Sequence, residues 1–340
     1  MDIPGNFTVA DSDRRILDQL GGFIPDRIFD FHAHLYDMSY LPVMAGPGTL
    51  FDECGAAGRR EYMKRQCPLY PGYKELRLNV VSMPDPTMVD LANGNRDKCN
   101  AFLTGHLKQN PDDVGEAFVL PGDTDDDING LLTHPNIKGL KCYHLTSAKK
   151  PTWHADISDY LPKSAWRAAH ERRLYITLHM VKDAALADPE NRRHIMEMTG
   201  KYPNATLILA HAARGFAAWT AAAGIKHIAH IPNIYIDVSA VCEPTAIIAA
   251  IRYAGPRRVL WGSDFPVSMQ RGKCISLSDK FLWLDKGMLE RTGAPEAEST
   301  NLVGVENLSA LWQACEILDL SREDAEAIFY DNAAELADKR

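Results

Sequence analysis

The sequence lacks the features of a protein held together by disulfides. It has seven cysteines, an odd number, and no two of them have the CxxC spacing of a zinc or redox motif. This pattern favours a reducing compartment, and the first residues contain no apolar stretch of the kind found in signal peptides. We therefore expect a cytoplasmic protein. The cysteines are Cys54, Cys67, Cys99, Cys142, Cys242, Cys274 and Cys315.

Long apolar runs and clusters of positive charge are also missing. No stretch approaches the roughly 18 apolar residues of a membrane-spanning helix, so we expect no membrane partner. No five basic residues follow one another, and the formal net charge is −8. A nucleic-acid surface needs clustered Lys and Arg, so nucleic acid is not expected either. A small molecule remains as the expected partner, and a local Arg or Lys can bind it even when it is anionic.

What the sequence does contain is a repeated alternation of apolar runs and helical patterns. The apolar runs are continuous or β-branched, as in strands buried on both faces of a parallel sheet. We expect strands at 28–33, 77–82, 116–120, 137–142, 174–179, 205–210, 234–239 and 258–263. We expect helices near 96–110, 124–134, 163–173, 190–201, 215–223 and 244–254. This alternation predicts one α/β domain over residues 1–340, folded as a (β/α)₈ TIM barrel.

An open, doubly wound sheet is the structural alternative, but no GxGxxG follows the first expected strand. Two segments, 35–76 and 265–305, have no clear periodicity. They follow the first and eighth strands, so we expect long βα loops at the C-terminal end of the barrel, where they would cover an active site. Helical patterns at 306–318 and 321–338 end the chain.

The strongest local motif is the sequence DFHAH at 30–34. Residues i and i+2 of a strand point to the same side, so His32 and His34 can reach one ion at the mouth of a barrel. Neutral imidazole is a good ligand for zinc and similar divalent ions. Taken alone the motif is weak, because two histidines at the end of a strand can also make ordinary hydrogen bonds.

Three further residues fall at the ends of expected strands. His179 ends the fifth strand, His211 follows the sixth, and Asp264 follows the eighth. The C-terminal ends of the strands are where catalytic side chains of such barrels project. Several titratable groups at the same level of different strands favour a shared metal site over unrelated polar residues of the core.

These residues together resemble the amidohydrolase superfamily, in particular its amidohydrolase-related (amidohydrolase 2) branch of metal-dependent hydrolases and decarboxylases. The resemblance includes DFHAH at 30–34, GLK at 139–141, ITLH at 176–179, LAH at 209–211 and LWGSDFP at 260–266. The end of the chain, IFYDNAAELA at 328–337, is similar to the closing helix of that branch. The motifs cover nearly the whole chain, and they are specific for the superfamily but not for a substrate.

The resemblance implies one divalent metal ion held by His32, His34, His179 and Asp264. Zinc is the expected ion, with manganese or iron as alternatives, and a catalytic zinc lowers the pKa of its water to about 7. Asp264 would act as general base and then pass the proton to the leaving group. His211 would stabilise charge on the attacked carbonyl oxygen. The resemblance also implies a homo-oligomer, most often a dimer.

Lys141 and Arg214 are the expected substrate-binding residues. In binuclear members of the superfamily a lysine at the place of Lys141 is carbamylated and bridges two ions. In the branch that this chain resembles it commonly stays unmodified, so we favour one ion with Lys141 facing substrate. Arg214 has two readings: a guanidinium that grips a substrate carboxylate in a fork, or a residue that pairs with a nearby acid. The AARG around it departs from the glycines of many relatives.

Other polar residues receive weaker predictions. Tyr143, His144, Asp237 and Ser239 fall near strand ends and are interpreted as pocket-lining or structural. The remaining histidines fall on expected helices or loops, where we expect ordinary surface residues: His106, His134, His154, His170, His194, His227 and His230.

The leading functional hypothesis is a metal-dependent hydrolase. It would cleave a C–N or C–O bond, as in an amide, lactone or ester, of a small, carboxylated substrate by means of metal-activated water. The alternative is non-oxidative decarboxylation of an unsaturated or aromatic acid at the same metal, because both reactions use the same ligands. A metal-free barrel with a binding role is a third class, and the intact set of ligands argues against it.

Overall fold

The computed structural model describes residues 8–293 and 300–338, so residues 294–299 of the predicted loop 265–305 lie outside it. Eight parallel strands follow one another around a nearly closed barrel in the order of the sequence. Every predicted strand is present, and every predicted range overlaps the observed one. The strands are β1 (Arg27–Ala33), β2 (Glu75–Val81), β3 (Val114–Phe118), β4 (Ile137–Cys142), β5 (Tyr175–Leu178), β6 (Thr206–Leu209), β7 (Ile234–Asp237) and β8 (Val259–Leu260). The (β/α)₈ fold is therefore confirmed.

The barrel closes between β1 and the chain that follows β8. The N–H of Phe31 donates to the carbonyl of Trp261 at 3.0 Å. The N–H of His34 donates to the carbonyl of Phe265 at 2.9 Å, and Ala33 and Phe265 form a parallel bridge. This closure joins the segment that contains the two histidines of DFHAH to the segment that contains Asp264.

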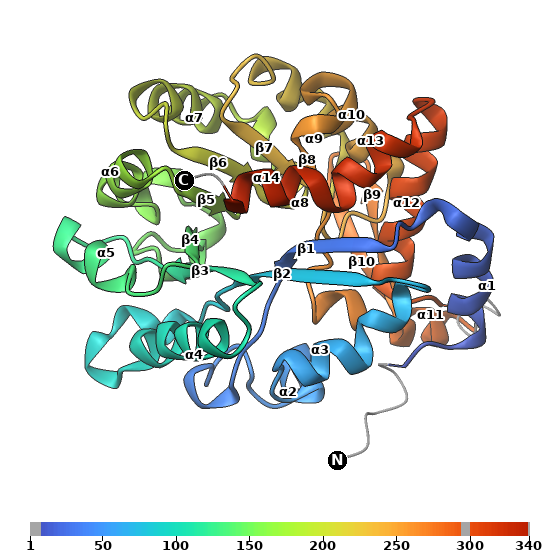
Figure 1. Ribbon diagram of the computed structural model, residues 1–340, viewed down its shortest axis with the longest axis horizontal. Helices are drawn as coiled ribbons and strands as arrows, with labels where there is room; N and C mark the ends of the chain where they lie inside the picture. Colours follow the sequence, from blue (N-terminus) through green and yellow to red (C-terminus); the bar gives the residue numbers. More distant parts are fainter. Residues whose placement is uncertain (1–7, 294–299, 339–340) are drawn as a thin grey trace.

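Helices surround the strands, and Figure 1 shows them on the outside of the barrel. Those between the strands are α2 (Leu50–Cys54), α3 (Arg59–Arg65), α4 (Asn95–Gln109), α5 (Asp125–Leu131), α6 (Lys163–Arg172), α7 (Pro189–Lys201), α8 (Ala210–Arg214), α9 (Ala218–Gly224) and α10 (Pro244–Ala254). The remaining ones are α1 (Asp11–Leu20), α11 (Lys286–Thr292), α12 (Val303–Ile317), α13 (Arg322–Glu326), a π-helical turn (Ala327–Asp331) and α14 (Asn332–Asp338). Among the described residues no helix is long and apolar enough to cross a bilayer.

The amino ends of the strands are filled by apolar and aromatic side chains. Phe29, Phe31 and Tyr175 belong to one buried cluster with Tyr330 and Leu336 of the C-terminal helical segment. The rings of Phe31 and Tyr175 lie 5.1 Å apart, and those of Phe29 and Tyr330 lie 6.0 Å apart. The end of the chain therefore covers this end of the barrel, and polar chemistry is left to the opposite end.

The segment after β8 forms a hairpin that the sequence did not predict. Strands β9 (Gly272–Leu277) and β10 (Lys280–Asp285) pair antiparallel. The hairpin is tied to α9, because Trp219 Nε1 donates to the carbonyl of Asp279 at 3.1 Å. An ion pair joins Lys280 to Asp183, in the loop after β5. The hairpin thus crosses the C-terminal end of the barrel.

Candidate metal centre

His32 of β1 and His34, just after β1, point their Nε2 atoms into one space. His32 is 1% exposed, and its Nδ1 lies 2.5 Å from Oδ2 of Asp237. Its Nε2 is buried and has no hydrogen-bond partner in the described part of the chain. His34 Nδ1 lies 2.9 Å from the carbonyl oxygen of Val81, and its Nε2 lies 3.3 Å from Oδ1 of Asp264. If each Nδ1–H donates to its acceptor, both Nε2 lone pairs are available for a cation.

Asp264 reaches this space because of the barrel closure. Its N–H donates to the carbonyl of His32 at 2.7 Å, and its Oδ1 lies 3.7 Å from His32 Nε2. The backbone of Asp264 has a φ of 57°, a left-handed conformation that Asp tolerates better than most residues. Gly262 permits the close approach, since a Cβ there would lie 2.6 Å from the Cβ of His32.

His211 belongs to the same cluster. Its Nδ1 lies 3.0 Å from the carbonyl oxygen of Ser239, and its ring stacks on that of His32 with centroids 5.0 Å apart. One potential ligand atom from each of His32, His211 and Asp264 lies within 4.8 Å of the other two. His211, which we predicted to act on the substrate carbonyl, therefore lies close to two of the predicted metal ligands, His32 and Asp264.

The backbone that presents His211 is strained. Residues 211–214 all have left-handed φ values between 50° and 60°, although none of them is glycine. Non-glycine residues in sparsely populated conformations cost of order 1–3 kcal/mol each, and they concentrate at functional sites. Ala212 and Ala213 thus hold a conformation that glycine would adopt more easily.

His179 lies beside this cluster, but it is not one of the three residues whose ligand atoms lie within 4.8 Å of one another. It is partly exposed, and its ring centroid lies 5.1 Å from that of His211 and 4.3 Å from that of Tyr143. The structure therefore brings together all five residues that the sequence singled out, with His179 on the pocket side. Which histidines bind the metal remains a prediction.

Burial and mutual charge set the protonation of the cluster. Burial lowers the pKa of His32 to about 4. Burial and the neighbouring His211 also lower the pKa of His179 well below its ordinary value. Burial alone would raise the pKa of Asp264, but His211, His34 and His32 outweigh it and hold this pKa well below its usual range. At neutral pH the centre consequently combines the neutral imidazoles of His32 and His179 with the ionised carboxylate of Asp264.

These features fit a divalent cation. A metal ligand must be deprotonated, and the imidazoles of His32 and His179 are neutral at neutral pH while Asp264 is ionised. The Nε2 of His32 is buried without a hydrogen-bond partner among the described residues, a cost that coordination would remove. The acceptors at the Nδ1 atoms are of the kind that orient metal-bound histidines. Nitrogen ligands with one carboxylate suit zinc and also manganese or iron.

Two buried aspartates support the cluster without belonging to it. Asp237 bonds His32 and also accepts the N–H of Ser239 at 2.6 Å. Asp30 accepts the N–H of Ser263 at 2.8 Å and the hydroxyl of Tyr62 at 2.6 Å, so it joins β1 to the chain next to Asp264. Sequence reasoning assigned no role to Asp30. Its place two residues before His32, on the same face of the strand, was the available signal.

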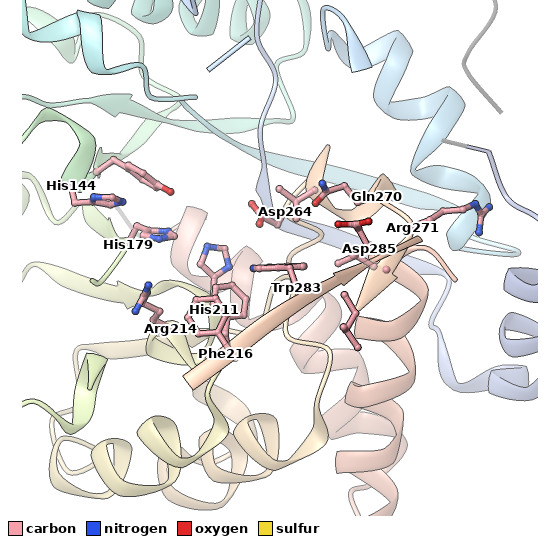
Figure 2. Close-up of a pocket in the computed structure, with 16 residues that line it drawn as sticks. His144, His179, His211, Arg214, Phe216, Asp264, Gln270, Arg271, Trp283 and Asp285 are labelled. Atoms are coloured by element: carbon pink, nitrogen blue, oxygen red, sulfur yellow. The ribbon is translucent and has the colours of Figure 1, made fainter. Parts of the chain in front are cut away.

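A pocket of about 490 Å³ opens beside these residues. His179, His211 and Asp264 line its inner side, and Figure 2 shows His144 and Arg214 at one end and Arg271 at the other. The hairpin supplies residues from β9 and β10, among them Phe281, Trp283 and Asp285. The prediction that segment 265–305 covers the site is therefore confirmed for its described residues.

Segment 35–76 contributes no residue to this pocket, but Gly48, Leu50 and Glu53 line an adjoining cavity together with Gln270, Arg271 and Asp285, which also line the pocket. Other residues of the segment pack against the barrel. Tyr62 bonds Asp30, and the hydroxyl of Tyr70 accepts Trp261 Nε1 at 3.1 Å. A loop rich in aromatic residues can bury them against the barrel, and this sequence does so.

Arg214 lines the pocket and forms no ion pair with an acid in the part of the chain that the structure describes. Its Nη1 donates to the carbonyl of Lys182 at 2.8 Å, and its guanidinium lies 5.1 Å from the ring centre of Phe281. Burial lowers its pKa, yet Arg remains charged in proteins. It forms no ion pair among the described residues, whereas Arg271 pairs with the fully buried Asp13 at 2.8 Å. The alternative reading, pairing with a nearby acid, is therefore wrong.

The structure also bears on the predictions made for Lys141 and His106. Lys141, predicted to face substrate, is 1% exposed and is not among the residues that line this pocket. His106, expected at the surface, is buried because its Nε2 bonds Asp113 Oδ2 at 2.8 Å. Of the weaker candidates, Tyr143 and His144 line the pocket, and Ser239 and Asp237 support histidines.

Comparison with known proteins gives a family and a fold. A family model described as Amidohydrolase matches residues 29–337. No curated protein matches the chain. Several solved structures do.

An amidohydrolase from Burkholderia multivorans with bound zinc has a TM-score of 0.59 at 15% identity, over 92% of this chain and 99% of that one. A 5-carboxyvanillate decarboxylase from Novosphingobium aromaticivorans, complexed with manganese, has a TM-score of 0.57 at 14% identity, over 99% and 100%. A dihydroxybenzoic acid decarboxylase from Polaromonas with bound manganese has 0.56 at 15%, over 92% and 97%. At these identities the likeness shows the fold alone.

Proposed function

The chain belongs to the amidohydrolase family, and from that premise we propose that it is a metal-dependent hydrolase. Its reaction would be the cleavage of a C–N or C–O bond, in an amide, lactone or ester, of a small carboxylated substrate. The observation that carries this proposal is the convergence of His32, His34, His211 and Asp264 beside a pocket that His211, Asp264 and Arg214 line. Arg214 forms no ion pair among the described residues.

The metal, when bound, would supply a Lewis acid that polarises the carbonyl and activates water. We assign His32, His34, His179 and Asp264 as its ligands. Asp264 is ionised at neutral pH, because the histidines around it lower its pKa, so it can accept the proton of the attacking water. His211, between the ligands and the pocket, would stabilise the charge that develops on the carbonyl oxygen.

Arg214 would bind the substrate carboxylate. A guanidinium held by one carbonyl and one aromatic ring keeps its other donors for a ligand, and a fork of two parallel hydrogen bonds suits a carboxylate. Substitution by Lys keeps the charge but loses the fork. We therefore expect Arg214→Lys to raise KM for the carboxylated substrate, with a much smaller effect on the matching amide-capped or ester-capped substrate.

The assignment of ligands is tested by comparing His179→Asn with His211→Asn. Metal content of each variant, purified without chelators, is measured alongside the wild type, for which about one equivalent of zinc, manganese or iron is expected. We expect His179→Asn to lose the metal and His211→Asn to keep it while losing turnover. The opposite result would exchange the two roles and leave the hydrolase proposal intact.

Decarboxylation of a planar, unsaturated or aromatic acid is the second candidate. The observation that favours it is the aromatic wall of the pocket, in which Phe216 lies 5.4 Å from both Phe281 and Trp283. Two of the similar solved structures are decarboxylases of aromatic acids. Turnover in labelled water separates the reactions, since hydrolysis places solvent oxygen in the product and decarboxylation places a solvent hydron on carbon.

The proposed hydrolysis itself is tested by a substrate screen of lactones, acyl-amino compounds and aromatic acids, run on the wild type and on Asp264→Asn. Loss of a measured activity in a variant that retains its metal would support Asp264 as the base, with a decrease of about 10²- to 10⁴-fold. An unchanged rate in that variant would refute the proposed role. The absence of bound metal from carefully handled wild-type protein would count against the whole proposal.

A further inference from the structure

The pocket beside the metal centre continues into a second cavity that has no part in the proposed reaction so far. This cavity has a volume of about 320 Å³ and shares Gln270, Arg271 and Asp285 with the pocket of about 490 Å³. Its other walls come from the segment after β1 and from the start of α11, and they consist of Gly48, Leu50, Glu53, Lys286 and Gly287. We call this cavity the second chamber. It adjoins the end of the pocket that Arg271 marks in Figure 2, opposite to Arg214.

The metal centre lies between these two ends. Figure 2 shows His211 and Asp264 with Arg214 on one side and with Gln270 and Arg271 on the other. A molecule bound at the centre can therefore extend in two directions. Each cavity has a volume within the range of about 300–1,000 Å³ that small-molecule sites have, so each can take one part of a two-part molecule. Such a molecule would be cleaved near its middle, whereas a decarboxylation releases only CO₂ and needs no second chamber.

The wall that the two cavities share is fixed in place. The N–H of Val303 donates to the carbonyl of Gln270 at 2.8 Å, and the N–H of Gln270 donates to the carbonyl of Val267 at 3.0 Å. The guanidinium of Arg271 is held by the buried Asp13 at 2.8 Å. The side chain of Gln270 lines both cavities and forms no hydrogen bond with a described residue, so its amide is available to a ligand within a rigid frame.

The charged side chains of the second chamber differ in whether they are neutralised. Both cations have acidic partners, because Arg271 is paired as described above and Lys286 Nζ lies 3.6 Å from Oε1 of Glu290. Glu53 and Asp285 line the same cavity and form no ion pair in residues 8–293 and 300–338. The charge that is left without a partner is therefore negative. A protonated amine suits such a cavity, because its N–H groups can donate to carboxylates and to the amide oxygen of Gln270.

We propose that the second chamber binds the leaving group of the substrate and that this group carries a basic amine. The substrate would have a carboxylated acyl part at Arg214, joined to the amine-bearing part by an amide or ester bond at the metal centre. On hydrolysis the oxygen of water bonds to the acyl carbon, the C–N or C–O bond breaks, and the leaving group takes the proton that Asp264 accepted. The inference rests on the proposed function and deepens it, because it narrows the substrate class to two-part molecules.

Binding of hydroxamic acids, which chelate zinc, tests the second chamber without turnover. Zinc-loaded wild-type protein would be titrated by calorimetry with ω-aminohexanohydroxamic acid and with heptanohydroxamic acid, which have the same chain length and end in an ammonium or a methyl group. We expect the amino probe to bind about 3- to 10-fold more tightly, since its ammonium meets exposed carboxylates. This preference should decrease as salt is added. It should be absent from the short pair of glycine hydroxamate and propionohydroxamic acid, which end close to the zinc.

Variants that remove one charge each locate the effect. Asp285→Asn keeps an acceptor for the N–H of Met288, which Asp285 Oδ1 accepts at 2.8 Å, and Glu53→Gln keeps the size of the side chain. We expect the double variant to bind the two long probes equally. Asp279→Asn is the matched control, because it removes the same charge from the turn between β9 and β10, outside both cavities. It should keep the preference of the wild type for the long amino probe.

Two results would overturn this inference and leave the hydrolase proposal standing: equal binding of both long probes by the wild type, or an unchanged preference in the folded double variant. The first of these needs no variant, so it decides the matter even if the double variant does not fold. A zinc-loaded wild type that binds none of the hydroxamic acids would refute the proposed function, and this inference with it.

Discussion

The two ends of the barrel use the same strands for opposite purposes. At the amino ends, Phe29, Phe31 and Tyr175 pack together and the C-terminal helical segment covers them. At the carboxyl ends, imidazoles and carboxylates are buried beside one another, and residues 211–214 have strained backbone. A few residues along one strand therefore separate packing that stabilises the fold from polar groups that cost stability.

The contrast shows how this fold tolerates an expensive site. Buried charges and left-handed alanines are unfavourable by themselves, so they persist only where the rest of the structure determines them. The amino end of the barrel, which the C-terminal helical segment closes, supplies the stabilising free energy through the burial of aromatic and apolar side chains. We call it the closed end, and we call the carboxyl end with the metal centre the open end. If this division is correct, substitutions at the closed end should mainly lower the stability of the fold, and substitutions at the open end should mainly lower metal affinity. The expected effects decrease from the closed end to the surface of the open end.

The largest effect is expected at the closed end. Phe29→Ala removes a fully buried ring that lies 5.7 Å from Phe31 and 6.0 Å from Tyr330. We expect the free energy of unfolding of the apoprotein to fall by about 3–5 kcal/mol, measured by urea denaturation. The zinc affinity of the folded variant should not change. Phe29→Leu, which leaves a smaller cavity, is the matched control, and a large loss of zinc affinity in the Ala variant would contradict the division.

The fold could be predicted well from the sequence because it depends on burial. Strands enclosed on both faces must be apolar, and all eight appear as such runs, from β1 to β8. The site residues His32, His34, His179, His211 and Asp264 could be found because they sit at strand ends, and their convergence follows from the parallel order of the strands. The family resemblance of the same motifs is confirmed by the match over 29–337.

Other features depended on contacts that no local pattern encodes. The burial of His106 requires Asp113, and the support given by Asp30 requires Tyr62, which comes from a segment without periodicity. The hairpin of β9 and β10 was missed because half of its residues are only partly buried, which weakens alternation. Glu116 and Lys141 lie at successive levels of β3 and β4 because of the register between these strands, and a sequence alone does not give the register.

The second prediction concerns the open end. Asp237→Asn removes the carboxylate that holds His32 Nδ1, while keeping the size of the side chain. Partners of this kind typically change metal affinity by about 10- to 100-fold, so we expect zinc affinity to fall by that factor, measured by competition with a chelator. The stability of the apoprotein should change less than in Phe29→Ala. A greater loss of stability than of zinc affinity would remove the distinction between the two ends.

The third prediction uses pH to sharpen the comparison. The ordinary pKa of a glutamate in water is 4.5, and burial raises the pKa of Glu116 to about 7 in the folded protein. The folded state therefore holds the proton more tightly, and the stability of the wild-type apoprotein should decrease as pH rises from about 4.5 to about 7. Glu116→Gln should lack this component, which is on the order of 3 kcal/mol. Equal pH slopes in both proteins would show that Glu116 is not buried as an acid.

The smallest effect is expected at the surface of the open end. Lys280 and Asp183 join the hairpin to the loop after β5, but their side chains are 53% and 67% exposed. Such pairs contribute about 0–1 kcal/mol and are screened by salt. We expect Lys280→Met to leave global unfolding almost unchanged while amides of β9 and β10 exchange hydrogen faster at low salt. Amides of β1, which belong to the barrel, should exchange at the wild-type rate. Faster exchange in β1 as well would mean that the hairpin and the barrel open together, so that the open end is no less stable than the strands on which it is built.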